Sequence, residues 1–312
     1  MATRIVSSQD GSKTTVRDLI ANPLVVPARI LSLLDQAFLS AALLRNEGPN
    51  ASSLVAYEES TPLYLDGDAE IVGEFAEIPV KVGQKGLPRI AQGTPEGLGV
   101  RISKRMRDMG LMGQVNRQIT QLENTMVRGD ERALRKLFDN PAIPTIAAGA
   151  AWDTSNGRPH KDFARAKAVI AKAKPAGASA ADSRFGFKAN TAVIPSDVTS
   201  VLEGNDNFAA VFNRDSLVNE DIRYTGKLPN KIAGLDPLET FSFADGKVLV
   251  LERLTVGFYS DFQPLEITEL YPEGNGPNGG PTQSWRSDAT RERVSAVDQP
   301  LAACWITGVL TP

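Results

Sequence analysis

Apolar residues recur at helical spacing between Leu111 and Phe138. Four of them follow one another at steps of four, three and four, which places them on one face of an α-helix, with polar residues on the other faces. These four are Val115, Ile119, Leu122 and Met126. Gly129 costs about 1 kcal/mol relative to Ala inside a helix, so we expect a kink or a restart there, with Asp130 as the cap of a second segment. The pattern predicts a long helix whose buried face these four residues form.

The sequence before this helix changes from a helical to a strand-like pattern. Asn22-Pro23 predicts a helix start, apolar residues then recur at helical spacing from Ile30 to Leu44, and Gly48-Pro49-Asn50 predicts the helix end. The residues before Asn22 lack a clear period and are expected to form an extended arm. From Ser53 to Val82 the pattern is that of strands.

This strand-like region predicts a two-stranded ribbon. The segment from Glu74 to Ile78 alternates charged and apolar residues, the period of a strand with one solvated face. A turn at Gly83–Gly86 and a second extended run from Leu87 to Ile90 complete the ribbon. Such a ribbon is marginal alone in water. We therefore expect it to lie on a neighbour, which need not be part of the same chain.

The second half of the chain alternates helices and strands. A helix is predicted from Lys161 to Lys174, a buried strand from Thr191 to Ile194, and another helix from Pro195 onward. A hairpin is predicted in which Asp245-Gly246 joins two strands, and several further strands follow it. The predicted hairpin strands are Leu238–Phe243 and Lys247–Leu251, and the later strands are Val256–Ser260, Leu265–Tyr271, Ser284–Val297 and Ala302–Leu310. The last is the most apolar and is expected at the centre of a sheet. This alternation indicates a mixed α/β unit.

Composition is that of an ordinary soluble protein. The chain has 312 residues, a formal net charge of −3 and one cysteine, Cys304, so it forms no intramolecular disulfide. Cys304 stands in an apolar run and is interpreted as a buried thiol. The most hydrophobic window, Ile30 to Leu44, contains Asp35 and is too short to span a bilayer. We expect a protein of a reducing compartment that does not contact a membrane.

Charged residues change sign along the ribbon. Between Arg45 and Lys81 there is no Lys or Arg, whereas the following stretch is mainly basic. The acidic residues are Glu47, Glu58, Glu59, Asp66, Asp68, Glu70, Glu74 and Glu77. The basic residues are Lys81, Lys85, Arg89, Arg101, Lys104, Arg105 and Arg107. Two explanations stay open: a solvated ribbon that pairs with itself, or acidic and basic faces that meet across subunits and set their register.

No catalytic or metal-binding set is visible. His160 is the only histidine and is expected at the surface, so neither a zinc cluster nor a Ser-His-Asp or Cys-His pair is proposed. Gly11-Ser12-Lys13-Thr14 resembles a phosphate loop, but Val6 stands where the first glycine is needed. A group of arginines such as Arg101, Arg105 and Arg107 usually forms a solvated or ion-paired face, and we interpret this group in that way. We predict no enzymatic activity and no cofactor.

The order of these elements is similar to that of a known family. The pieces are GEFAEIPV leading through a turn to GLGVRISKRMRD, then VNRQITQLENTMVRGDERAL, AAWDTSNGRPHKD, TAVIPSDVTSVL, DGKVLVLERLTVGFYSDFQPLEITELYP and WRSDATRERVSAVDQPLAACWITGV. From about Ser53 to the C-terminus, the chain resembles the major capsid proteins of tailed double-stranded DNA bacteriophages, which have the HK-ninety-seven (Johnson) fold. No single motif is specific, but the colinear order is.

This resemblance implies an α+β fold with named parts. Residues 1–50 would be an N-terminal arm and 51–100 the extended E-loop. Residues 101–149 would be the peripheral domain with its long spine helix, and 261–299 its return strands. Residues 150–260 would be the axial domain, and 300–312 its last strand. The arm is shorter than in members with a cleaved scaffolding segment, which favours a separate scaffolding protein or none.

The resemblance also implies a function and partners. Subunits would form hexamers and pentamers that close into an icosahedral head, a virion assembled in the host cytoplasm. Further partners would be a portal, scaffolding or decoration proteins, and packaged double-stranded DNA bound non-specifically on the inner face. Intersubunit contacts are expected from Glu70, Glu74, Glu77, Lys81, Lys85, Arg89, Arg101, Arg105 and Arg107. Some members crosslink an E-loop lysine to a distant asparagine, for which Lys81 or Lys85 with Asn275 or Asn278 are candidates.

Three alternatives remain at this point. One is an encapsulin-type compartment for a protein cargo, against which the N-terminal arm and the phage-like order of the pieces argue. Another is a different phage structural part, such as a tail-tube subunit, which would form rods. The third is a soluble α/β enzyme with a site that the sequence does not reveal. Shell size, host and the residues at each symmetry axis do not follow from the sequence.

Overall fold

The computed structural model describes residues 20–311, apart from 23, 35–37, 63, 66, 68, 176–183, 209–230, 242, 244–245 and 277–278, and apart from the side chains of residues 32 and 33. Several predictions fall outside these residues. They are the arm before residue 20 with its glycine-lysine motif, the helix start at Pro23, and the positions Asp66, Asp68 and Asn278.

Helix α5, Met112–Phe138, is a single helix of 27 residues. The four residues predicted to form its buried face are all buried. The expected kink or restart at Gly129 was wrong, because the helix continues through it. Asp130 does not cap a second segment; its carboxylate is buried and accepts hydrogen bonds from Ser40. Packing of Leu134 and Phe138 beyond the glycine outweighs its low helix propensity.

Helix α5 covers one face of a five-stranded sheet. Its strands run in the order β1 (Arg45–Pro49), β9 (Phe258–Ile267), β11 (Ser284–Ala296) and β10 (Tyr271–Pro272), and β4 (Thr94–Ser103) also pairs with β11. The core between helix and sheet includes Val100 and Ile102 of β4 and Trp285 and Ala289 of β11. The short helix α4, Lys104–Asp108, joins β4 to α5 and is capped by Ser103.

The single helix predicted over the region from Ile30 to Leu44 is two helices. Helix α2, Val25–Leu34, and helix α3, Leu39–Leu43, are separated at Phe38, whose backbone is extended. The predicted stop at Gly48-Pro49-Asn50 was also wrong, since the helix ends at Leu43 and β1 follows, parallel to β9. Both helices contact α5, and Val26, Ile30 and Leu34 of α2 are buried, whereas Leu31 is 44% exposed. The local pattern of the sequence does not identify α5 as the packing partner.

The second unit is built on another five-stranded sheet. Its strands run in the order β5 (Thr145–Ala147), β12 (Ala303–Thr307), β8 (Val248–Leu251), β6 (Thr191–Pro195) and β7 (Asp236–Thr240). Helices α6 (Pro159–Ala171) and α7 (Ser196–Gly204) pack on this sheet, and the 3-10 turn η1 (Pro300–Ala302) precedes β12.

The predicted hairpin in this unit was wrong. Strand β6 lies between β7 and β8, parallel to β7 and antiparallel to β8. On its other side, β8 pairs with β12. Strand β12, which was predicted for the centre of the sheet, lies between β5 and β8. All four residues of β8 are buried. An apolar strand buried on both faces gains more from two strand neighbours than from one local partner.

Strands β2 (Leu54–Glu59) and β3 (Leu87–Gln92) form an antiparallel pair with a long loop between them. The strand predicted from Glu74 to Ile78 was wrong for the single chain, because this segment turns at Glu74 and Phe75 and has no strand partner. Its apolar side chains Phe75 and Ile78 are exposed and pack on nothing in the part of the chain that the structure describes. The loop therefore keeps a strand-like sequence without a strand.

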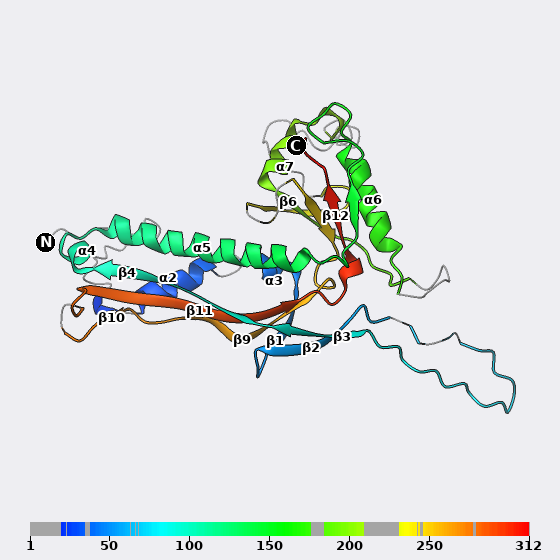
Figure 1. The fold of residues 1–312 in the computed structure, drawn as a ribbon, viewed down its shortest axis with the longest axis horizontal. Helices are drawn as coiled ribbons and strands as arrows, with labels where there is room; N and C mark the ends of the chain where they lie inside the picture. Colours follow the sequence, from blue (N-terminus) through cyan, green and yellow to red (C-terminus); the bar gives the residue numbers. More distant parts are fainter. Residues whose placement is uncertain are drawn as a thin grey trace.

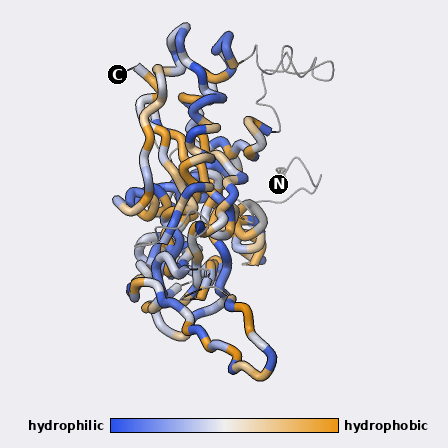
Figure 2. The backbone as a smooth tube through the Cα atoms, turned by 90° about the vertical axis from the view of Figure 1, so that its right-hand side faces the viewer, coloured by the Kyte–Doolittle hydropathy of each residue, from blue (hydrophilic) through white to orange (hydrophobic). Residues whose placement is uncertain are grey.

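The parts form an elongated molecule with three projections (Figure 1). The sheet of β11 and the overlying α5 make a long arm, which is distinct from the N-terminal arm predicted for residues 1–50. The second unit rises from one end of this long arm, and the loop between β2 and β3 extends outward from the same end. Figure 2 shows hydrophobic segments both inside the second unit and along this loop, which lies far from either core. Helix α5 contributes to both cores, with Met126 in one and Phe138 in the other.

Candidate assembly surfaces

The loop between β2 and β3, residues 60–86, carries apolar side chains that nothing in the described chain covers. Phe75 is 99% exposed and Ile78 is 75% exposed. Ile71, Val80 and Val82 are similarly open. A contiguous run of exposed apolar residues of this kind is typical of a protein–protein contact.

The base of this loop is held firmly to the body. Tyr57 of β2 packs edge-on against Phe258 of β9, with 5.5 Å between ring centroids. The buried carboxylate of Glu59 accepts a hydrogen bond from Arg89 at 2.7 Å. The backbone N–H of Ser60 donates to the carbonyl of Asp298 at 2.8 Å. The ribbon therefore leaves the body in a defined direction.

A half-open polar hollow lies beside this base. Arg45 donates a hydrogen bond to Asp298 at 3.2 Å across it. Burial raises the pKa of the Asp298 carboxyl, although the charge of Arg45 opposes this rise. The hollow has a volume of about 460 Å³ and separates the ribbon from β1.

Several of the charges expected to contact neighbours are paired within the chain. Their ion pairs are Lys81 with Glu70 at 2.7 Å, Arg89 with Glu59 at 2.7 Å, Arg101 with Glu273 at 2.6 Å and Arg107 with Asp108 at 3.0 Å. Arg107 also lies over the ring of Trp285. The idea that the ribbon pairs with itself thus accounts for Glu70, Lys81 and Arg89.

Four of the predicted contact residues are left over. Glu74, Glu77, Lys85 and Arg105 make no ion pair with any residue that the structure describes. Of these, both glutamates flank the exposed Phe75 and Ile78. The end of the loop therefore combines open apolar surface with uncompensated negative charge.

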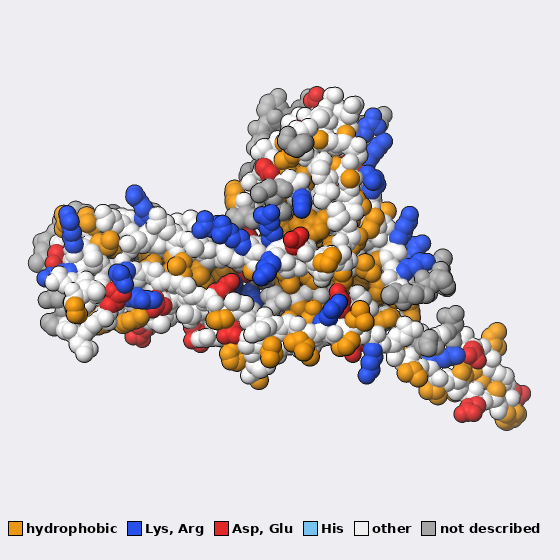
Figure 3. Space-filling model, viewed as in Figure 1, with side chains coloured by type: hydrophobic (Ala, Val, Ile, Leu, Met, Phe, Trp, Pro, Cys, Tyr) orange, Lys and Arg blue, Asp and Glu red, His pale blue; other side chains and the backbone are white. Residues whose placement is uncertain are grey.

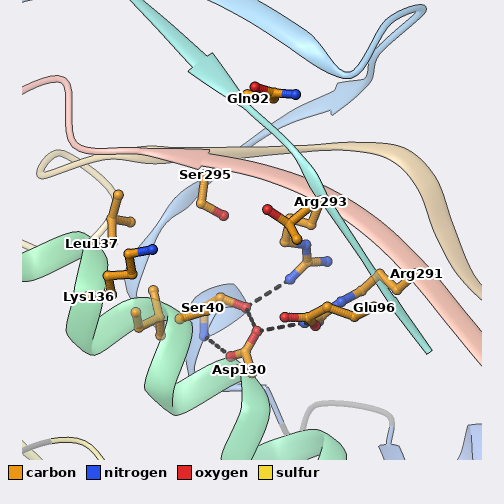
Figure 4. A pocket seen from close by; sticks show the side chains of 12 residues that line it. Ser40, Gln92, Glu96, Asp130, Lys136, Leu137, Arg291, Arg293 and Ser295 are labelled. Atoms are coloured by element: carbon orange, nitrogen blue, oxygen red, sulfur yellow. Dashed lines mark hydrogen bonds and ion pairs between the residues drawn. The ribbon is translucent and has the colours of Figure 1, made fainter. Parts of the chain in front are cut away.

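A buried network of charges, which the sequence did not reveal, ties the long arm together (Figure 4). Asp130 of α5 accepts hydrogen bonds from the backbone and hydroxyl of Ser40 in α3, at 2.9 and 2.7 Å. Its other partner is Arg291 of β11, at 3.2 Å. Arg293 donates to the Ser40 hydroxyl at 2.8 Å and pairs with Asp261 of β9. Four elements meet in this one network.

The network borders a hollow of about 380 Å³ between α5 and the strands. Lys136 and Leu137 lie on one side of it, and Ser295 lies across from them (Figure 4). Arg291 is buried over the ring of Phe38, and its Nε and Nη1 have no hydrogen-bond partner within the described chain. Glu96 and Asp130 balance its charge. The described lining of the hollow contains no His or Cys.

The remaining candidates from the sequence carry no site. Cys304 is fully buried, and burial raises the pKa of its thiol to about 11, which suppresses its reactivity. Among the described residues, no group of three or more His, Cys, Asp or Glu is placed to hold a metal ion. Within the same residues, no helix combines the length and apolar character needed to cross a bilayer.

Comparison with known proteins assigns this architecture. A family model described as phage capsid protein matches residues 89–298. No curated protein matches the chain. A crystal structure of a phage-related protein from Bordetella bronchiseptica RB50 is similar, with 15% identity, a TM-score of 0.56, and coverage of 91% of this chain and 98% of that one.

Two further structures show the same fold. One is from Microbacterium phage Oxtober96, with 14% identity, a TM-score of 0.55, and coverage of 86% of this chain and 90% of that one. The other is a virus-like particle from Pyrococcus furiosus, with 12% identity, a TM-score of 0.54, and coverage of 90% and 97%. The chain belongs to the phage capsid protein family, and its mixed α+β fold is the HK-ninety-seven-like fold of the major capsid proteins of tailed bacteriophages.

Proposed function

We propose that this protein self-assembles as hexamers and pentamers into an icosahedral phage head that encloses double-stranded DNA. The observation that carries the proposal is the loop of residues 60–86, which leaves its own body with Phe75 and Ile78 open to solvent. Exposed apolar patches of this kind mark protein–protein contacts, and we assign this contact to another copy of the chain. Membership of a capsid family supports a structural rather than an enzymatic role.

Each part that the resemblance names is assigned to an observed part of the structure. The long arm with α5 is the peripheral domain, the second unit is the axial domain, and the loop is the E-loop. In a closed ring, the E-loop of each subunit lies on the next, so that its apolar residues are buried and Glu74 and Glu77 meet basic side chains such as Lys85 or Arg105 of a neighbour. A head-to-tail contact of this kind closes into a ring when the rotation from one copy to the next is a full turn divided by a whole number.

Assembly in the host cytoplasm yields the virion, and the remaining partners follow from it. A portal replaces one pentamer in such a head, and scaffolding or decoration proteins bind the inner or outer face. The pairing of Glu70 with Lys81 within the loop supports Lys85 over Lys81 as a lysine available to a neighbour.

Particle mass and shape test the proposal directly. The purified protein should run far above the monomer in size exclusion, and negative-stain images should show closed shells or rings of five and six. A stable monomer or dimer that never assembles under any salt or concentration would contradict the proposal. Rods would instead indicate a tail component.

A second function is a particle that carries no phage genome, such as a compartment for a protein cargo, and one similarity is compatible with it. The similarity to a virus-like particle from Pyrococcus furiosus has a TM-score of 0.54, close to that of the phage structures. The contents of purified shells separate the two functions. Nuclease-protected double-stranded DNA supports the head, whereas one co-purifying protein and no nucleic acid supports the compartment.

A further inference from the structure

The outer face of α5 has a charge distribution unlike that of the chain as a whole. The helix contains five cations and three acids. All five cations are exposed and none of the acids is. The cations are Arg117, Arg128, Arg132, Arg135 and Lys136, and the acids are Glu123, Asp130 and Glu131. The chain has a net charge of −3, so this separation places an almost purely positive surface on an acidic protein.

The spacing of these cations aligns them along the helix. Arg117, Arg128 and Arg135 are separated by eleven and seven residues, which at 3.6 residues per turn places them within about 20° of one another. They span about 27 Å at 1.5 Å per residue. The buried face with Ile119 and Met126 lies on the opposite side. Figure 3 shows Lys and Arg side chains along the upper margin of the arm that α5 forms.

The other exposed residues of this face indicate the kind of partner. Between the arginines lie Gln121, Asn124 and Thr125, which offer amide and hydroxyl hydrogen bonds. No large apolar side chain of α5 is exposed. Protein interfaces usually centre on apolar or aromatic residues. A flat row of guanidinium groups with amides between them instead suits phosphate groups, which arginine binds in a bidentate manner.

We propose that the exposed face of α5 is the inner wall of the head, and that it contacts the phosphate backbone of the packaged DNA without reading its sequence. The inference rests on the proposed function, since it names the surface that meets the enclosed DNA. Each subunit supplies only a few phosphate contacts, so single subunits bind weakly. Hundreds of copies around one molecule of DNA make the sum effective.

The first test is the binding of a labelled 30-base-pair duplex to unassembled capsomers, measured by fluorescence anisotropy across a salt series. The triple variant Arg117→Gln/Arg128→Gln/Arg132→Gln should reduce the slope of log K against log salt by about 2.7, which is about 0.9 for each lost phosphate contact. Between 50 and 200 mM salt, the unmodified protein should therefore lose about 40-fold more affinity than the variant. The matched control Lys161→Gln/Lys172→Gln/Arg253→Gln removes three exposed cations elsewhere and should leave the slope unchanged.

Two results of this test would overturn the proposal. One is equal loss of DNA binding in the triple variant and its control. The other is equally strong, salt-dependent binding of polyglutamate, which would assign the face to an acidic protein partner instead. Normal far-ultraviolet circular dichroism of each variant ensures that binding, and not folding, is compared.

The second test locates the face within DNA-filled particles. Asn124→Cys places one accessible thiol among the arginines, because Cys304 is fully buried. A photo-crosslinker attached to this thiol before assembly should form adducts with the packaged DNA. Filled particles without adducts would show that α5 faces outward if, in a parallel preparation whose Asn124→Cys thiol was left unmodified, intact filled particles react with a bulky external maleimide. Failure to form any particle would contradict the proposed function, while the duplex-binding result would still stand by itself.

Discussion

Asp130 and Arg291 form a buried ion pair of 3.2 Å although 161 residues separate them in the chain. Asp130 belongs to the C-terminal half of helix α5 and Arg291 to the longest strand of the sheet beneath it. The same carboxylate accepts two hydrogen bonds from Ser40. Three segments that are distant in sequence are thus fixed at one point, and the helix is positioned on its sheet by a polar contact as well as by the core.

Removing this carboxylate should destabilise the subunit strongly. Asp130→Ala leaves the buried guanidinium of Arg291 with only Glu96, and breaking one partner of a buried pair costs about 3–5 kcal/mol. Urea unfolding of the unassembled subunit measures the change. Asp108→Ala, which removes the exposed partner of Arg107, is the control and should cost less than about 1 kcal/mol. A loss for Asp130→Ala as small as that of the control would mean that the network contributes no stability.

Residues that pack locally were predictable, and this network was not. The spacing of Val115 to Met126 placed them on one face because a helix repeats every 3.6 residues whatever covers it. One signal for Asp130 was present, since it lies four residues after Met126 and four before Leu134, within the buried stripe. Its partners could not be inferred, because Ser40 and Arg291 reach it only through the tertiary fold.

The two incorrect strand predictions share a physical cause. The apparent hairpin around Gly246 satisfied local turn rules, but β6 takes the place between its two strands. The alternating segment at Glu74 has the pattern of a strand but no strand partner among the described residues. In the first case, pairing with a distant segment decides the structure; in the second, the strand-like pattern finds no partner among the described residues. A local pattern carries no information about either outcome.

A charge under the spine helix should prevent folding. In Ile119→Asp or Leu122→Asp, a carboxylate replaces a side chain buried against β4 and β11, at a cost of several kcal/mol without a compensating partner. Circular dichroism and the soluble yield of the expressed subunit report the result. The neighbouring Thr120→Asp lies on the exposed face and should fold normally. Folded, cooperative Ile119→Asp would show that this face is not buried as the structure has it.

The single thiol should react only when the protein unfolds. Burial raises the pKa of Cys304 from 9.0 to about 11, so at pH 8 about one thiol in a thousand is ionised. A colorimetric disulfide reagent should therefore detect no thiol at pH 8 in the native subunit and one thiol in guanidinium chloride. The unfolded chain loses this proton at lower pH than the folded chain, so the contribution of Cys304 to stability should fall between pH 9 and 11. Rapid native labelling at pH 8 would show that the strand opens readily.

Charge reversal at the end of the loop should separate folding from assembly. Glu74→Lys/Glu77→Lys changes two side chains on the exposed loop that form no ion pair with the described chain, so the free energy of unfolding should change by less than about 0.5 kcal/mol. If these carboxylates meet basic residues of a neighbour, the variant places like charges together and should reduce the yield of closed shells several-fold in sedimentation.

The control for this variant reverses two exposed acids outside the loop, Glu239→Lys/Glu269→Lys, which alters net charge by the same amount. Because a change in net charge alone affects the assembly of any shell, only the difference between the two variants reports on the loop. High salt should partly restore assembly of the loop variant, since screening weakens repulsion between like charges. Normal shells from Glu74→Lys/Glu77→Lys at low salt would refute the charge contact and leave the apolar residues around Phe75 as the basis for docking of the loop.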